Sequence, residues 1–401
     1  MSQPDLPGRP GDPQLLERVR ARLLGQAGPA TPSRVAAAVR AEGEILGDAE
    51  VLALSRELGA ELTGAGPLEP LLGRPEITDI LVNGPHEVWI EAGRGLERVP
   101  EVSFPDDDAV RSLAQRLAAQ AGRRLDAAAP WIDARLTSGA RFHAVLAPLS
   151  PGGTCLSLRL PRRRVFTLAE LVAAHGLPPE GAEILRGIVA ARLPFLICGG
   201  TGSGKTTLLS ALLSVVAPSE RLILVEDAPE LRPDHPHVVQ LQTRPANIED
   251  RGGVEIHHLV RQALRMRPDR LVVGEVRGPE VTSLLNALNT GHEGGACTLH
   301  ANTAADVPAR LEALGCAAGL SRAAVHSQLA ATRVVVAHLT RSDTGTRRLA
   351  EICCLARDPT GVVQSVPAAT FNPTGALTPG PAWPELCRRL QGHWTPVEVP
   401  R

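Results

Sequence analysis

The chain has 401 residues, enough for two domains, because single hydrophobic cores rarely grow beyond ~250 to 300 residues. Lys and Arg total 42 against 43 Asp and Glu, so the net charge of −1 gives no global field that favours nucleic acid or an anionic membrane surface. Tyr is absent and aromatic residues make up 2%, which disfavours a single-strand nucleic-acid groove lined with stacking side chains.

Cysteine usage and hydropathy bear on the compartment. The seven cysteines are an odd number scattered along the chain, unlike the disulfide framework of a secreted protein. The N-terminus lacks the apolar run of a signal peptide, and there is no stretch of ~18 consecutive apolar residues. We therefore expect a cytoplasmic protein, and peripheral membrane association stays open.

The first half of the chain changes character near Gly64. Residues 1–63 combine proline-rich stretches, expected to be disordered, with helical segments such as "RVAAAVRAEGEIL". Residues 64–160 contain short strands joined by turns, around one helix at 106–122 that begins with acidic residues. This pattern predicts a small α+β domain over 64–160.

The second half is of the α/β class. After a basic linker at 161–180, residues 181–358 alternate continuous apolar strands with helices, which predicts a parallel sheet covered on both faces. "RVVVAHLTR" and "RRLAEICCLARD" are expected to form a hairpin appended to this domain. Residues 359–401 contain eight prolines and are interpreted as a proline-rich tail, a weak candidate for independent structure.

One motif indicates nucleotide chemistry. "GGTGSGKTT" fits G-x-x-x-x-G-K-[ST], with the apolar strand "FLIC" before it and a helix after it. Such glycines let backbone N–H groups turn toward phosphates at a helix N-terminus. Lys205 is expected to reach the β- and γ-phosphates, and the Thr206 hydroxyl to bind Mg²⁺. The predicted nucleotide-binding residues are Gly199, Gly200, Thr201, Gly202, Ser203, Gly204, Lys205, Thr206 and Thr207.

Acidic residues follow two further apolar strands. "LILVEDAPEL" places Glu226, Asp227 and Glu230 after one strand, and "RLVVGEVRG" places Glu275 after another. In an open parallel sheet the ligand sits at these carboxyl ends. A carboxylate there either holds Mg²⁺ through water or orients the attacking water, although Asp227 and Glu230 are also suited to capping a helix. The absence of an N-K-x-D sequence favours ATP over GTP.

In this order, the motifs resemble the ATPases of type II and type IV secretion. The resemblance is greatest to the CpaF/TadA-type ATPases of tight-adherence (Flp) pili, including actinobacterial relatives associated with conjugal transfer. It is carried by "GGTGSGKTT", "VEDAPEL", "TRPANIEDRGGVEIHHLVRQALRMRPDRLVVGEVRGPEV" and "LNALNTGHEGGACTLHANTAADVPARLEAL". With weaker matches before them, the similarity spans about residues 65–340.

The resemblance implies a homohexamer whose chains each pair a PAS-like sensor domain with a RecA-like motor domain. It also implies ATP and Mg²⁺ as cofactors, membrane platform proteins as partners, and a place at the cytoplasmic face of the inner membrane. By this similarity Glu230 is the candidate water-activating base and Glu275 the candidate Mg²⁺ residue, acting through water, and the two roles are exchangeable. Gly274 stands where many ATPases have an acid.

Arginines are expected to complete the catalytic set. Charge that builds on the γ-phosphate is stabilised by a guanidinium that arrives when domains or subunits close. The resemblance makes Arg135, Arg141 and Arg159 of the first domain candidates for this role. Each of them is equally suited to a surface or structural ion pair.

"NTGHEGGACTLHAN" contains His292, Cys297 and His300. Zinc binding lacks a fourth ligand, and a strand would send Cys297 and His300 to opposite faces. Either histidine alone also fits a satisfied core position. The third interpretation places His292 and His300 near the γ-phosphate, where a histidine donates to phosphate or to Glu275 and the glycines at 291–295 act as a hinge.

Three functions remain in competition. The first is a hexameric motor ATPase that drives pilus assembly or type II/IV secretion. The second is a nucleotide-binding regulatory subunit with little hydrolysis. The third is a DNA-transfer ATPase. Because the net charge is near zero, we expect no direct specific binding of nucleic acid, which argues against this third function.

Overall fold

The computed structural model describes residues 13–24, 31–43, 46–52, 54, 58, 64–93, 95–160, 165–244, 251–289, 291, 293–342 and 345–394. The chain divides into two compact units, Met1–Arg163 and Arg164–Arg401. The segment 1–63 includes helices α1 (Pro13–Leu24) and α2 (Pro32–Ala41), which share a small apolar cluster that includes Val19 and Val35.

A six-stranded antiparallel sheet forms the centre of the first unit, in the order β3-β2-β1-β6-β5-β4. Helix α5 (Asp107–Gln120) buries Val110 and Leu113 in the same core as Ile80 and Phe142 of the sheet. Asp106 caps α5 by accepting from the N–H of Ala109 at 2.8 Å. The other elements are η1 (Gly66–Leu68), α4 (Glu69–Leu72), β1 (Asp79–Asn83), β2 (Val88–Glu91), β3 (Leu96–Arg98), β4 (Trp131–Arg135), β5 (Arg141–Val145) and β6 (Cys155–Arg159).

The second unit contains a nine-stranded sheet of order β15-β14-β13-β12-β7-β11-β10-β8-β9. The six strands from β12 to β9 run parallel, and β13, β14 and β15 continue the sheet in antiparallel register. The mixed α/β fold is thereby confirmed. The parallel strands are β7 (Phe195–Gly199), β8 (Leu222–Glu226), β9 (Val238–Gln242), β10 (Arg270–Val276), β11 (Ala296–Leu299) and β12 (Val335–Arg341), and β13 spans Arg347–Arg357.

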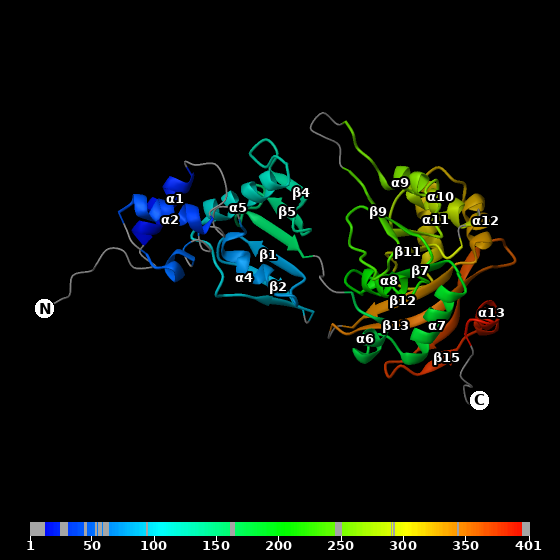
Figure 1. Cartoon of the computed structure of the whole chain (residues 1–401). Helices are drawn as coiled ribbons and strands as arrows, with labels where there is room; N and C mark the ends of the chain where they lie inside the picture. The colour runs from blue at the N-terminus through cyan, green and yellow to red at the C-terminus, as the bar shows by residue number, and fades with distance from the viewer. Residues whose placement is uncertain are drawn as a thin grey trace. The chain divides into compact units, whose positions relative to one another are not determined.

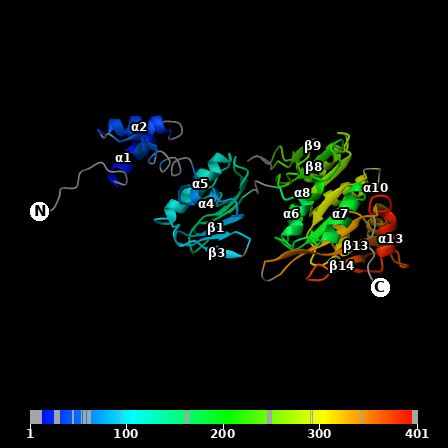
Figure 2. The ribbon, with the colours of Figure 1, turned by 60° about the horizontal axis from the view of Figure 1, so that its bottom comes forward.

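Helices cover this sheet on both faces, as Figures 1 and 2 show. One apolar core lies under α6 (Leu168–Ala173), α7 (Pro179–Ala190), α8 (Lys205–Leu213) and α13 (Trp383–Arg389). The other lies under α9 (Ile256–Ala263), α10 (Glu280–Asn289), α11 (Val307–Ala317) and α12 (Arg322–Thr332). Because both faces are buried, β7 and β8 are apolar along almost their whole length.

The structure differs from the expected linker and tail. Helix α6 lies inside the stretch 161–180, and residues after 358 extend the sheet through β14 (Val363–Phe371) and β15 (Leu377–Pro379). The prolines lie where a missing N–H does no harm. Pro367 faces Cys353 beside a register shift, and Pro379 ends the edge strand. Proline content alone was therefore a poor guide to order here.

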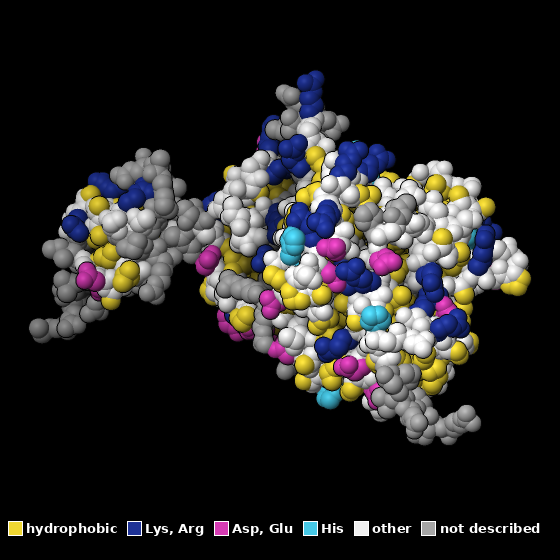
Figure 3. Space-filling model, turned by 45° about the vertical axis from the view of Figure 1, so that its right-hand side comes forward, with side chains coloured by type: hydrophobic (Ala, Val, Ile, Leu, Met, Phe, Trp, Pro, Cys, Tyr) yellow, Lys and Arg dark blue, Asp and Glu magenta, His cyan; other side chains and the backbone are white. Residues whose placement is uncertain are grey.

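The length of the helices and the distribution of surface charge indicate how the protein can contact a membrane. Among the described residues, no helix is long and apolar enough to cross a membrane. On the face drawn in Figure 3, basic and acidic side chains are interspersed, in keeping with the balanced charge of the chain.

Candidate active site

The carboxyl ends of four neighbouring parallel strands meet at one edge of the nine-stranded sheet. In spatial order, β7 leads into the glycine-rich loop, β11 into His300, β10 carries Glu275 near its end, and β8 ends at Glu226. This order differs from that along the chain, because β11 lies between β7 and β10. This strand order brings together four segments that are far apart in sequence, at the edge where open parallel sheets bind their ligands.

The glycine-rich loop between β7 and α8 has a backbone that favours glycine. Gly199, Gly202 and Gly204 have φ angles of 151°, 71° and 96°. A Cβ at Gly199 would lie 2.3 Å from the carbonyl oxygen of Leu339. Ser203 Oγ is buried without a hydrogen-bond partner among the described residues. A glycine cradle with a buried hydroxyl, at a helix N-terminus, fits the oxygens of a phosphate.

Lys205 begins α8 and is the only lysine in the chain. Its ammonium group donates to the carbonyl oxygens of Gly199 (3.0 Å) and Gly200 (2.8 Å). Burial lowers the pKa of Lys205, and the nearby Glu275 carboxylate acts in the opposite direction. The side chain thus places a cation at the glycine-rich loop. That it reaches the β- and γ-phosphates stays a prediction.

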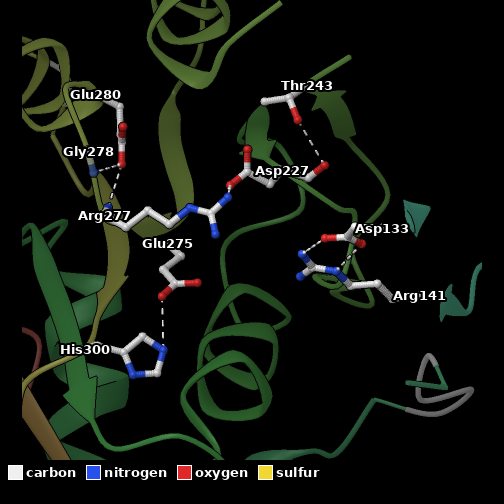
Figure 4. Close-up of polar contacts among 9 residues, drawn as sticks. All are labelled: Asp133, Arg141, Asp227, Thr243, Glu275, Arg277, Gly278, Glu280 and His300. Carbon is white, nitrogen blue, oxygen red and sulfur yellow. Dashed lines mark hydrogen bonds and ion pairs between the residues drawn. The ribbon is translucent and has the colours of Figure 1, made fainter. Parts of the chain in front are cut away.

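His300 connects Lys205 to Glu275. Its Nδ1 lies 3.4 Å from Lys205 Nζ and its Nε2 lies 3.0 Å from Glu275 Oε1. Figure 4 shows the imidazole and the carboxylate pointing toward each other. Because an ammonium only donates, Nδ1 accepts and the Nε2–H donates to the carboxylate. Burial first, and then Lys205, lowers the pKa of His300, in agreement with a neutral ring.

Gly274 stays small because a carboxylate of the next strand lies against it. A Cβ at Gly274 would lie 2.7 Å from Glu226 Cγ. Glu226 is buried, and its Oε1 accepts from the backbone N–H groups of Glu230 and Leu231, both at 3.0 Å. Glu226 therefore shapes the loop that carries Glu230. Its position at the end of an apolar strand placed Glu226 among the candidate carboxylates of the sequence, but its contacts with Gly274 and with the loop were not predicted.

The other two acidic residues of this loop have different surroundings. Asp227 forms an ion pair with Arg277, seen in Figure 4. Glu230 is exposed, and its carboxylate makes no hydrogen bond or ion pair with any residue that the structure describes. Neither residue caps a helix, because the next element is the strand β9. The capping alternative is therefore wrong for both.

The three candidate arginines lie on strands of the first unit. Arg141 Nη2 lies 2.9 Å from Asp133 Oδ2, and Arg159 Nε lies 3.0 Å from Asp79 Oδ1. Arg135 donates to a backbone carbonyl in the turn of its own hairpin at 3.2 Å. These contacts all lie within the first unit, so a role toward nucleotide stays a prediction.

His292 lies outside the described residues, but the glycines near it are informative. Gly294 has φ 71°, and a Cβ there would lie 2.8 Å from Arg270 Nη1. Arg270 is fully buried and pairs with Glu220 at 2.9 Å. The backbone at position 294 lies so close to this ion pair that only glycine fits. This packing explains the glycine without any hinge motion.

Cys297 is separate from this site. Its side chain is 4% exposed and belongs to the core under α9 to α12. Burial raises the pKa of Cys297 to about 12, so its sulfur stays a thiol, whereas zinc binds the thiolate. The zinc interpretation is therefore disfavoured by the chemistry of Cys297 itself.

Two arginines of the β12–β13 hairpin were missed by the sequence analysis. Arg347 Nε donates to the carbonyl oxygen of Gly202 at 2.7 Å. Arg341, its Cα partner across the hairpin, brings Nη1 to 3.1 Å from the position of a Cβ on Gly202. Since 145 residues separate Arg347 from Gly202, only the sheet topology brings them together.

A glycine-rich loop between strand and helix, with its lysine linked to a carboxylate on a nearby strand, defines a P-loop ATPase. The family model for type II/IV secretion system proteins matches residues 61–373, and the chain belongs to this family. It is accordingly an ATP-binding ATPase of the secretion type.

Known proteins support this placement. The chain is 58% identical over 328 residues to a Mycobacterium tuberculosis (strain H37Rv) protein named for conjugal transfer, covering 80% of this chain and 93% of that one. It is 36% identical over 260 residues to the type IV secretion system protein PtlH of Bordetella pertussis, covering 59% and 76%. The crystal structure of the pilus retraction motor PilT with bound ADP is 21% identical with a TM-score of 0.50, covering 73% and 82%, and shows the shared fold alone.

Proposed function

We propose that this ATPase is a motor that works as a homohexamer and couples ATP hydrolysis to assembly of a Flp-type pilus or to type II/IV secretion. The observation that carries the proposal is the contact chain Lys205, His300 and Glu275 at the edge of the parallel sheet. It joins the phosphate-binding loop to a carboxylate through a side chain on a third segment. A change at the phosphates is thereby passed to β10 and β11, as a motor requires.

Each part of the proposed site has a chemical task. The backbone of residues 199–207 holds the phosphates, and Lys205 supplies a cation at the β- and γ-phosphates. The Thr206 hydroxyl and the Glu275 carboxylate, through water, are the proposed Mg²⁺ residues, since Mg²⁺ prefers oxygen ligands. Either Glu230 or Glu275 acts as the base that orients the attacking water. When bound, Mg²⁺ neutralises charge on the phosphates.

We propose roles for the remaining residues and for the partners from the resemblance to the family. The first unit is proposed to be the PAS-like sensor domain, with Arg135, Arg141 and Arg159 acting on nucleotide when units or subunits close. His292 is proposed to act beside His300. The partners would be membrane platform proteins, with the ATPase at the cytoplasmic face of the inner membrane.

The test is steady-state ATP hydrolysis by the purified full chain. Lys205→Ala is expected to abolish turnover by weakening phosphate binding, and Glu275→Gln to lower kcat on the order of 10²-fold or more. Glu183→Gln, on the exposed side of α7, is the matched charge control and is expected to behave as the wild type. Undiminished turnover in both Lys205→Ala and Glu275→Gln would refute the proposal.

DNA transfer is the second candidate function, favoured by the name of the mycobacterial relative. A DNA-transfer motor in direct contact with its substrate would be stimulated by DNA, and the stimulation would weaken with salt as counterions compete. We expect no such stimulation, because the chain is almost neutral. ATP hydrolysis measured with and without DNA over a salt series distinguishes the two.

A further inference from the structure

A buried histidine, His338 on β12, contacts the loop that follows His300. Its Nε2 donates to the carbonyl oxygen of Asn302 at 3.0 Å, and its Nδ1 lies 3.2 Å from Glu351 Oε1. The His338 side chain is 6% exposed. His338 and Glu351 face each other across β12 and β13, directly beside a register shift. Both ring nitrogens are therefore engaged.

Both partners of His338 are hydrogen-bond acceptors. A carbonyl oxygen can only accept, and so can an ionised carboxylate. The hydrogen bond from His338 is the main cause that lowers the pKa of Glu351, so this carboxylate is ionised near neutral pH. Each ring nitrogen must then carry a proton, and His338 is an imidazolium in this arrangement. The buried positive charge is compensated by the adjacent carboxylate.

Two other histidines show that this state is specific to His338. His326 on α12 is also buried beside a carboxylate, and its Nε2–H donates to Glu312 at 2.9 Å. Its Nδ1, however, accepts from the backbone N–H of Val363 at 3.0 Å, so a neutral ring satisfies it. His300 likewise accepts at Nδ1 from Lys205. Of these three, only His338 requires the second proton.

The Glu351 carboxylate lies on β13 beside the buried Cys353, whose Sγ lies 3.6 Å from its Oε2. The ion pair therefore binds the loop at the Asn302 carbonyl, two residues beyond His300. The next residue of β12, Leu339, has its carbonyl against Gly199 of the phosphate-binding loop.

We propose that His338 and Glu351 are positioning residues for ATP hydrolysis: as an ion pair they hold the loop at Asn302 and thereby keep His300 between Lys205 and Glu275. The inference rests on the proposed role of His300. It makes hydrolysis depend on a proton that lies away from the nucleotide.

The other titratable groups near His338 do not replace this charge. Cys353 belongs to β13, and Cys198 of β7 is the Cα partner of His338 on the other side. Burial raises the pKa of Cys198 to about 12 and keeps that of Cys353 high, so both thiols stay neutral. Asp306 and Lys205 act on Cys198 through space only. Glu351 is therefore the charged partner in contact with His338.

The decisive comparison is Glu351→Leu with Glu351→Gln in the full chain. Leucine removes the acceptor of the His338 Nδ1–H, so we expect kcat to fall about tenfold with KM within about twofold. The glutamine amide still forms a hydrogen bond with Nδ1, so Glu351→Gln should retain most of the turnover that Glu351→Leu loses. Glu312→Leu, the same change beside His326, is the matched control and should keep the wild-type kcat. Equal kcat values for Glu351→Leu and the wild type would overturn the proposal.

A second variant removes the imidazole of His338 itself. His338→Leu removes both bonds, and we expect kcat to fall about tenfold to about hundredfold with KM within about twofold, because His300 is displaced while the phosphate loop remains. An unchanged kcat contradicts the proposal. If this variant does not fold, the Glu351→Gln comparison decides alone. Lys205→Ala separates a failure of the proposed function from a failure of this inference. Undiminished turnover in Lys205→Ala would refute the hydrolysis site, independently of the result for His338.

Discussion

The His300 imidazole and the Glu275 carboxylate meet at 3.0 Å, from the loop after β11 and from the end of β10. Glu275 lies within a register shift between Val273 and Val276, so the strand is irregular where it carries the carboxylate. Thr298 of β11 donates to the carbonyl oxygen of Gly274 at 2.6 Å and fixes the two strands beside this contact. The pair is thus held by backbone structure on both sides.

Replacing His300 should separate hydrolysis from binding. We expect His300→Ala to lower kcat about tenfold to about hundredfold, because Glu275 loses its donor, while Lys205 keeps its contacts with the loop carbonyls. Steady-state kinetics and ATP affinity measure the two effects. His143→Ala, at an exposed histidine of the first unit, is the control. Parallel losses of affinity and thermal stability would instead indicate a structural histidine.

The two candidate bases should differ in kcat. Glu275 contacts His300 and influences the Lys205 ammonium, whereas Glu230 is exposed and unpaired among the described residues. We expect Glu275→Gln to lower kcat on the order of 10² to 10⁴ and Glu230→Gln to have the smaller effect. Single-turnover hydrolysis compares them directly. A larger loss in Glu230→Gln would reverse the assignment.

The hairpin arginine should act on nucleotide affinity. Arg347 donates to the Gly202 carbonyl oxygen of the glycine-rich loop and adds positive charge beside that loop. We expect Arg347→Ala to weaken ADP binding about threefold to about tenfold, a modest effect because the site is exposed to solvent. The neighbouring Arg348, which donates to Thr340 instead, provides the matched Arg348→Ala control. Equal affinities for the two variants would remove Arg347 from the site.

Gly274 should tolerate no side chain. Glu226 cannot move aside easily, because it is buried and accepts from two backbone N–H groups. Gly274→Ala is expected to lower the free energy of unfolding by about 1 to 3 kcal/mol and to impair hydrolysis. Gly152→Ala, where a Cβ meets nothing within 4 Å, is the control. Denaturant unfolding of both variants gives the comparison, and equal stabilities would contradict it.

Local motifs predicted much of this site, because a phosphate-binding loop is formed by consecutive residues. The apolar strands around Gly199 and Glu275 are also short runs of consecutive residues, so the sequence predicted the parallel sheet as well. The sequence did not reveal Arg347, nor that Glu226 packs against Gly274 and binds the loop, because these contacts depend on strand order and on the bulk of a neighbouring residue. It also misplaced the end of the second unit, because Pro367 fits beside a register shift that no local pattern shows.

The most direct measurement uses the fact that Lys205 is the only lysine. The only amino groups that a reagent such as trinitrobenzenesulfonate can modify are this side chain and the α-amino group, which serves as the internal reference, and peptide mapping separates them from any modified cysteine. Peptide mass spectrometry of the full chain then reports Lys205 labelling with and without Mg²⁺ and ATP. We predict that saturating ATP suppresses labelling of Lys205 and leaves the α-amino group unchanged. Equal labelling of Lys205 in both conditions would contradict nucleotide binding at residues 199–207.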